Sequence, residues 1–171
     1  MRRRHSRMGQ YIIKQNLFAI RDKFMIKDTE GNPRFLCHGS LLKIRQTFWL
    51  ETPSGAPLFT AKRKLFTFLP KFDIYDAQDE KIATLDVKLS AFVKKIKVES
   101  ERYGSFFIRG GVVAWDFTIF SGEDEDGVVC AQISKRIFNV RDAYNVDIYS
   151  GKESFIMTLC IIIDALYHKA K

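Results

Sequence analysis

Two lysine-rich stretches contain the residues best suited to bind an anionic ligand. Residues 62–71 read Lys-Arg-Lys-Leu-Phe-Thr-Phe-Leu-Pro-Lys, and residues 94–97 read Lys-Lys-Ile-Lys. Ammonium groups attract phosphate oxygens, so both stretches suit a phosphate-bearing partner such as a lipid headgroup or a nucleic acid. The candidate anion-binding residues are Lys62, Lys64, Lys94, Lys95 and Lys97.

These lysines cannot all lie on one surface if the two stretches are β-strands. Side chains of a strand alternate between its two faces, so Lys62 and Lys64 point one way and Arg63 points the other, while Lys95 and Lys97 share a face. At most part of each stretch therefore forms a single basic face. A simpler interpretation is that the lysines are outward charges that discourage edge pairing and aggregation.

Three phenylalanines accompany the first lysine-rich stretch, namely Phe66, Phe68 and Phe72. Aromatic rings near lysines can act as a stacking platform for the bases of a nucleic acid. Burial of the rings in the wall of a β fold is the simpler expectation. Both interpretations stay open from the sequence.

The other reactive side chains form no recognisable catalytic or metal site. His5, His38 and His168 are scattered, and no cysteine has a Cys or His partner at zinc-finger spacing. The dense acidic cluster at residues 123–126 falls on an expected hairpin tip, where carboxylates are solvated. Neither a Gly-x-Ser-x-Gly elbow nor a nucleotide-binding glycine loop is present. We expect no catalytic residue, no metal and no cofactor.

The length and charge of the chain indicate one domain with a basic start. With 171 residues, 46% of them hydrophobic, the chain suits a single core. Four arginines before residue 8 carry half of the net charge of +8. We expect residues 1–9 to form a disordered basic tail, and residues 10–171 to form the domain. The tail has either no role or a role in contacting nucleic acid or an acidic membrane, and Met8 is an alternative start.

Cysteine usage indicates a reducing compartment. Cys37, Cys130 and Cys160 are odd in number, widely spaced and surrounded by apolar residues, so we expect small core residues and no disulfides. No apolar segment follows the N-terminal arginines, which excludes a secretory signal. The expected location is the cytoplasm, with peripheral attachment to a membrane if the basic face is functional.

Turn-forming residues recur at a fixed interval along the chain. Glycine and Asx residues accept the positive φ that tight turns require, and the ends of six such turns lie 23 to 25 residues apart. The turns are residues 28–31, 52–55, 76–79, 101–104, 124–127 and 149–151. One interval holds two strands, and residues such as Tyr144, Val146 and Ile148 alternate with polar neighbours as in a strand. About 12 antiparallel strands over residues 10–150 would then curl or close.

The last segment has the character of a buried helix. Residues 154–169 contain no turn former, and residues 155–166 are apolar nearly all round, so we expect a helix over residues 152–168 that is buried on every side. Ser150 and Glu153 have capping-box spacing. The segment is too short to span a bilayer and carries Asp164, which we expect to meet a backbone group, a lysine or water. A barrel of about 12 strands leaves a lumen wide enough for such a helix.

Several segments resemble the LURP-one-related family, part of the wider tubby-like group. They are Phe-Ala-Ile-Arg-Asp-Lys-Phe-Met-Ile-Lys-Asp (18–28), Lys-Leu-Phe (64–66), Asp-Phe-Thr-Ile (116–119), Ile-Ser-Lys-Arg-Ile-Phe (133–138), Arg-Asp-Ala-Tyr-Asn-Val-Asp-Ile (141–148) and Ile-Asp-Ala-Leu-Tyr-His (163–168). The resemblance covers nearly everything after Gln10 and implies a 12-stranded barrel around a central helix. It implies no catalytic activity.

The resemblance also implies two kinds of ligand. Tubby-like domains bind phosphoinositide headgroups through basic strand residues, although no lipid motif matches here residue for residue. Phospholipid scramblases share the architecture, and residues 142–148 are similar to a segment for which calcium binding has been proposed. This chain continues with Tyr149, Ser150, Gly151 and Lys152 where more oxygen ligands are needed, so we expect no calcium site.

The sequence therefore predicts a mainly β fold, a tubby-like barrel with a central helix, and a non-enzymatic binding role. The first functional hypothesis is docking on anionic phospholipid headgroups through the five candidate lysines. The alternative is a scaffold that binds a protein partner or, less favoured, a nucleic acid through the same basic face. The third is an enzyme whose site is assembled from residues without a recognisable motif.

Overall fold

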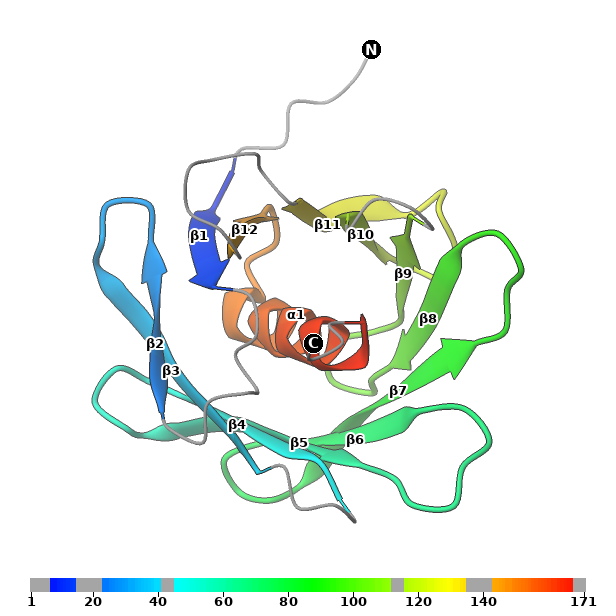
Figure 1. Cartoon of the computed structure of the whole chain (residues 1–171), viewed down its shortest axis with the longest axis horizontal. Coiled ribbons are helices and arrows are strands. Elements are labelled where there is room, and N and C mark those ends of the chain that lie inside the picture. The colour runs from blue at the N-terminus through cyan, green and yellow to red at the C-terminus, as the bar shows by residue number, and fades with distance from the viewer. Residues whose placement is uncertain (1–6, 15–22, 41–44, 112–115, 135–142, 168–171) are drawn as a thin grey trace.

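A closed wall of antiparallel strands surrounds a central helix in the described part of the chain (Figure 1). The computed structural model describes residues 7–14, 23–40, 45–111, 116–134 and 143–167. The strands are β1 (Gly9–Lys14), β2 (Phe24–Asp28), β3 (Pro33–Ser40), β4 (Thr47–Glu51), β5 (Pro57–Arg63), β6 (Lys71–Tyr75), β7 (Lys81–Lys88), β8 (Lys94–Glu99), β9 (Phe106–Gly110), β10 (Asp116–Ser121), β11 (Val128–Ser134) and β12 (Ala143–Ile148). The helix α1 (Glu153–Tyr167) follows β12 and runs through the interior.

The barrel closes at β1, which pairs with β12 on one side and with β2 on the other. Gly9 lies opposite Ile148, and Tyr11 lies opposite Asp28. Each remaining strand pairs with its neighbours in sequence, so the predicted barrel of about 12 antiparallel strands is confirmed. A closed barrel has no edge strand. The simpler interpretation of the lysines therefore keeps only its other part, that outward charges discourage aggregation.

The predicted turn interval corresponds to one hairpin after another. Residues 28–31, 52–55, 76–79, 101–104 and 124–127 each lie at the connection of an even-numbered strand to the next strand. Asp79 has φ of 60°, a value that Asx residues tolerate better than most side chains, so this turn closes without glycine. The sixth predicted turn, residues 149–151, joins β12 to α1 instead of closing a hairpin.

The core lies between the inner face of the wall and α1. Alternate residues of the strands point inward, as Tyr144, Val146 and Ile148 do in β12. Every helix residue from Phe155 to Ile163 is buried, which confirms the prediction of a helix enclosed on all sides. Burying one large apolar side chain contributes about 1.5–3 kcal/mol, so the helix supplies much of the driving force for closing the wall.

The start of α1 differs from the predicted capping box. The Ser150 hydroxyl accepts a hydrogen bond from the Lys152 amide, and the Lys152 carbonyl accepts the first helical bond from Ile156. The Glu153 carboxylate turns away and accepts bonds from the Tyr11 hydroxyl and the Arg34 guanidinium. Glu153 therefore ties the helix to β1 and β3, because partners on the closed wall outcompete the local backbone. His168 and Lys169 lie outside the described residues.

The described chain starts inside the stretch that was expected to be a tail. The Met8 amide donates to the Ile148 carbonyl, and Arg7 Nε lies 3.4 Å from Asp147 Oδ1. Strand β1 begins at Gly9. Residues 7–9 are therefore attached to β12, while residues 1–6 lie outside the described part of the chain.

The two ends of the barrel have different contents. One end, called the turn end here, carries the hairpin turns and the start of α1, where the rings of Phe155 and Tyr103 lie 4.5 Å apart. The opposite end, called the loop end, carries the connections 64–70 and 89–93. It also holds the last residue of α1, Tyr167, whose ring lies 5.3 Å from that of Phe117.

Candidate docking surface

Lys62 lies on the outer wall and reaches toward the turn end. Its Nζ is 3.1 Å from Asp79 Oδ1 and 4.2 Å from the centre of the Tyr75 ring. Both partners hold the ammonium group along the wall of the barrel. Much of its charge is therefore balanced within the protein.

Lys64 follows β5 directly and begins the 64–70 loop. Its Nζ is 3.9 Å from Asp73 Oδ2, a long ion pair. The nearly buried Asp73 carboxylate also lies 2.9 Å from Lys81 Nζ and accepts a bond from Thr84. Because Asp73 is shared with Lys81, it balances the charge of Lys64 only in part, and the Lys64 ammonium group can also attract an outside ligand.

Strand β8 divides the other three candidate lysines between its faces. Lys94 is two residues from the buried Ile96 and therefore shares its inner face, at the loop end. Its Nζ is 4.9 Å from the centre of the Tyr167 ring and 5.3 Å from that of the Phe117 ring. Burial there lowers the pKa of Lys94. Lys95 and Lys97 point outward, and Lys97 Nζ is 3.4 Å from Glu123 Oε2.

Lys95 lies directly opposite a further lysine that the sequence did not single out. The register of β7 and β8 pairs Lys88 with Lys95, and both side chains are on the outer face. Like charges in facing positions repel, at a cost of a few tenths to about 1 kcal/mol. Lys88 has only a distant ion pair, 3.8 Å from Asp86, which also binds Lys71. The register thus places two outward-facing lysines in directly opposite positions near the loop end.

The loop end also exposes large apolar side chains. Phe66 is fully exposed and Phe68 is 93% exposed in the 64–70 loop, while Leu89 is 77% and Phe92 is 83% exposed in the 89–93 loop. The expectation of burial in the wall holds for Phe72, which is fully buried in β6, and is wrong for Phe66 and Phe68. Both rings lie in the connection between β5 and β6, where side chains no longer alternate between the two faces of a strand.

The two loops are neighbours on adjacent hairpins. The Val87 amide donates to the Pro70 carbonyl over 3.1 Å, so the base of one loop is bonded to the base of the other. Residues 62–71 and 86–97 together hold eight lysines and arginines and one acid, Asp86. Their net charge of +7 compares with +8 for the whole chain. This set of loops and flanking residues is called the loop-end patch below.

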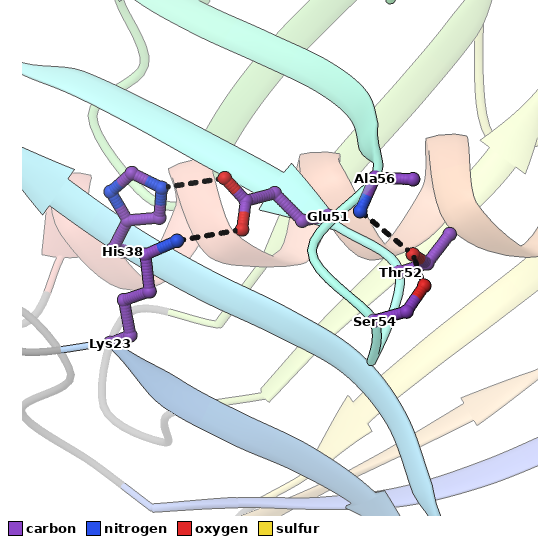
Figure 2. A network of polar contacts seen from close by, with 6 residues as sticks. All are labelled: Lys23, His38, Glu51, Thr52, Ser54 and Ala56. Atoms are coloured by element: carbon purple, nitrogen blue, oxygen red, sulfur yellow. Dashed lines mark hydrogen bonds and ion pairs between the residues drawn. The ribbon is translucent and has the colours of Figure 1, made fainter.

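A second polar cluster, which the sequence did not indicate, lies on the outer face of β3 and β4. Figure 2 shows Glu51 between His38 and Lys23, with Oε1 3.0 Å from His38 Nε2 and Oε2 3.0 Å from Lys23 Nζ. Burial alone would raise the pKa of Glu51, but the bonds from His38 and Lys23 outweigh it and hold that pKa below its usual range. The His38 ring stacks on Trp49 at 4.8 Å.

This cluster resembles part of a catalytic triad, but three nearby described residues with a thiol or hydroxyl, Cys37, Thr52 and Ser54, are buried or engaged in other bonds. The neighbouring Cys37 points into the core and is fully buried, and burial raises its pKa, which keeps the thiol protonated. The hydroxyls of Thr52 and Ser54 bond to each other, and Thr52 also caps the Ala56 amide in the turn (Figure 2). The arrangement ties β3 and β4 to the residue that precedes β2 at the surface.

The acidic residues 123–126 are partly paired instead of simply solvated. Glu123 binds Lys97, Glu125 binds the Arg109 guanidinium, and Asp124 accepts a bond from the Asp126 amide. The cluster therefore balances one cation on each strand, Lys97 on β8 and Arg109 on β9. Positive charge that is left over concentrates toward the loop end.

Asp164 lies in the core near the end of α1 and is fully buried. Burial raises the pKa of this carboxyl to about 7. The same carboxylate acts electrostatically on Tyr144 and Cys37, whose own pKa values are raised by burial first and by Asp164 second. The pKa of Asp164 is therefore set by its burial in the core.

Two further features concern the described residues only. Within those ranges no group of three or more His, Cys, Asp or Glu side chains is arranged to hold a metal ion. No helix of the described chain is both long and apolar enough to cross a bilayer. Asp142, the first residue of the calcium-like segment, lies outside the described residues.

A closed twelve-stranded wall around a buried C-terminal helix places the chain in the tubby-like class of barrels. The family model of LURP-one-related proteins matches residues 10–164, so the chain belongs to the LURP-one-related family. A protein of Arabidopsis thaliana, solved by X-ray crystallography, matches with a TM-score of 0.63 over 92% of this chain and 90% of that chain, at 17% identity. That identity supports the shared fold alone. No curated protein matches the sequence.

Proposed function

We propose that this barrel is a non-enzymatic domain that docks on anionic phospholipid surfaces through the loop-end patch. The observation that carries the proposal is the pairing of Lys88 with Lys95 across two strands, beside loops that expose apolar side chains. A phosphate-bearing surface relieves the repulsion between the two ammonium groups. The place of action proposed is the cytoplasmic face of a membrane, in keeping with three unpaired cysteines.

The five lysines proposed from the sequence contribute unequally. Lys64 and Lys95 lie at the loop end with Lys88, whereas Lys94 lies on the inner side of that end, against the rings of Phe117 and Tyr167. Lys62 and Lys97 lie farther along the wall and are each balanced by an acid, Asp79 or Glu123. We therefore assign Lys62 and Lys97 a supporting role in attraction at longer range.

Reversing the charge of Lys88 and Lys95 together is expected to weaken binding to anionic vesicles by about tenfold or more. A lysine close to an anionic leaflet contributes about 1 kcal/mol, and a reversal turns that attraction into repulsion. The measurement is co-sedimentation of wild type and K88E/K95E with phosphatidylcholine vesicles that contain or lack phosphatidylserine or a phosphoinositide.

The control is Lys27→Glu, an exposed charge reversal on β2 across the barrel, and it is compared with the single reversals K88E and K95E, because each of the three changes the net charge by the same amount. It is expected to bind nearly as wild type does. Equal losses for K27E, K88E and K95E would show that overall charge alone is responsible and would overturn the assignment of the patch. Absence of wild-type binding to every anionic vesicle would overturn the proposed function.

The same assay distinguishes a nucleic acid ligand. Single-stranded and duplex oligonucleotides are added as competitors at two salt concentrations. Added salt weakens electrostatic binding to either ligand, so the comparison is made within each salt concentration, where oligonucleotide at equal phosphate is expected to displace little of the vesicle-bound protein. Tighter binding to oligonucleotide than to vesicles at both concentrations would favour the scaffold hypothesis.

A further inference from the structure

We infer that the 64–70 and 89–93 loops form a membrane-inserting tip, in which Phe66, Phe68, Leu89 and Phe92 enter the boundary between headgroups and acyl chains. This inference rests on the proposed function, because insertion requires that the loop end face the bilayer. It adds a second kind of contact to the electrostatic one. It also defines the orientation of the barrel, with the loop end against the membrane.

The exposure of these side chains has no explanation within the fold. Loops usually expose small or polar residues, yet four large apolar side chains here are at least 77% exposed on two bonded loops. Single exposed apolar residues are ordinary, whereas a group of them marks an interaction site. Both of these bonded loops thus present apolar side chains outside the core.

The backbone holds one of these rings in an unfavourable conformation. Phe66 has φ of 59°, in the left-handed region that a bulky side chain rarely adopts. Such a conformation persists where the surroundings impose it, and it is concentrated at functional sites. Here it directs the ring outward, away from the wall.

The distribution of charge identifies an anionic bilayer as the partner. Lys64 and Lys71 flank the first loop, and Lys88, Lys94 and Lys95 flank the second. An anionic bilayer presents phosphates at its surface and apolar acyl chains beneath them. Apolar tips with cations set behind them therefore match both layers at once. An apolar protein groove would match the tips but not the net positive charge of the residues behind them.

The test replaces the tip side chains while keeping the loop conformation. Asparagine tolerates the left-handed region, so Phe66→Asn combined with Phe92→Ser removes two rings and retains the backbone at residue 66. We expect F66N/F92S to bind phosphatidylserine-containing vesicles at least tenfold more weakly than wild type. The control Val128→Asn removes an exposed apolar side chain at the turn end and is expected to bind as wild type does.

A direct measure of insertion uses tryptophan in place of Phe66 or Phe92. With vesicles, F66W and F92W are expected to shift their emission to the blue and to be quenched by brominated acyl chains, relative to the wild-type signal. V128W is expected to show neither change. Thermal unfolding of each variant verifies the fold, and the melting temperatures are expected to equal that of wild type because the replaced side chains are exposed.

The outcomes separate this inference from the proposed function. Wild-type binding that is salt-sensitive and unaffected by F66N/F92S, with no quenching of F66W or F92W, would overturn insertion and leave electrostatic docking standing. Failure of wild type to bind any anionic vesicle would overturn both. Quenching of F66W and F92W together with weaker binding of F66N/F92S supports the tip.

Discussion

Replacing Phe155 by alanine is expected to lower the free energy of unfolding by about 3–5 kcal/mol. Its ring is buried at the start of α1, with centroids 4.5 Å from Tyr103, 5.6 Å from Phe106 and 5.8 Å from Phe59. These partners belong to the closed wall and its turns, which cannot collapse into the space left by the ring. Urea unfolding followed by circular dichroism measures the loss.

Phe66→Ala provides the matched control, since the same ring is removed from a fully exposed position. Its free energy of unfolding is expected to change by about 0.5 kcal/mol or less. If F155A and F66A differed by less than 1 kcal/mol, the interpretation of α1 as the core of the barrel would be wrong.

The second large effect is a pH dependence of stability that originates at Asp164. Its carboxyl has an ordinary pKa of 3.8, which burial raises to about 7 in the folded protein. Below pH 4 the group is protonated in both states and has no effect. Between pH 4 and 7 the unfolded state ionises while the folded state keeps its proton, so the free energy of unfolding falls as pH rises and levels off above pH 7.

Asp164→Asn is expected to remove this fall, because the amide is neutral at every pH. A pKa difference of about three units corresponds to about 4 kcal/mol, which is the upper limit for the gain of D164N over wild type at pH 8 relative to pH 4. Tyr144 and Cys37, the titratable groups that interact with Asp164, have raised pKa values and do not ionise in this range.

Urea unfolding of wild type and D164N at pH 4, 6 and 8 measures the difference directly. Surface groups such as His38 and Glu51 are common to both proteins, so their contributions cancel in the comparison. Parallel pH profiles for the two proteins would show that Asp164 ionises normally in the folded state. The assignment of a neutral carboxyl in the core would then be withdrawn.

Stability and docking are located in different parts of this molecule. Phe155 and Asp164 lie in the enclosed core, whereas Phe66 and Phe92 lie on loops outside the wall. Variants of the loop-end patch are therefore expected to change vesicle binding and leave the free energy of unfolding unchanged. Core variants that stay folded are expected to change that free energy and leave vesicle binding unchanged. This separation lets each experiment above be interpreted without correction for unfolding.

The barrel and its helix were predictable from the sequence because their signals are local. Turn residues at intervals of 23 to 25 mark hairpins through the φ values that they accept, and alternation marks the strands between them. The helix was recognisable by a long apolar run without turn formers. Its predicted capping box was wrong because Glu153 found partners in Tyr11 and Arg34, which are distant in sequence.

The docking surface was predictable only in part. The sequence identified Lys95 as a candidate but not its neighbour Lys88, since the two come together only through the register of β7 and β8. It did not predict that Phe66 and Phe68 lie outside the wall while Phe72 lies inside. The cluster of Lys23, His38 and Glu51 likewise joins residues that are distant in sequence, so no local pattern indicated it.

The sequence by itself determined the number of strands, the buried helix and the excess of positive charge. Only the tertiary structure decided which charges are balanced and which apolar side chains face solvent. The physical reason is that periodicity and turn chemistry act between residues near in sequence, whereas ion pairing and exposure depend on which hairpins become neighbours when the barrel closes.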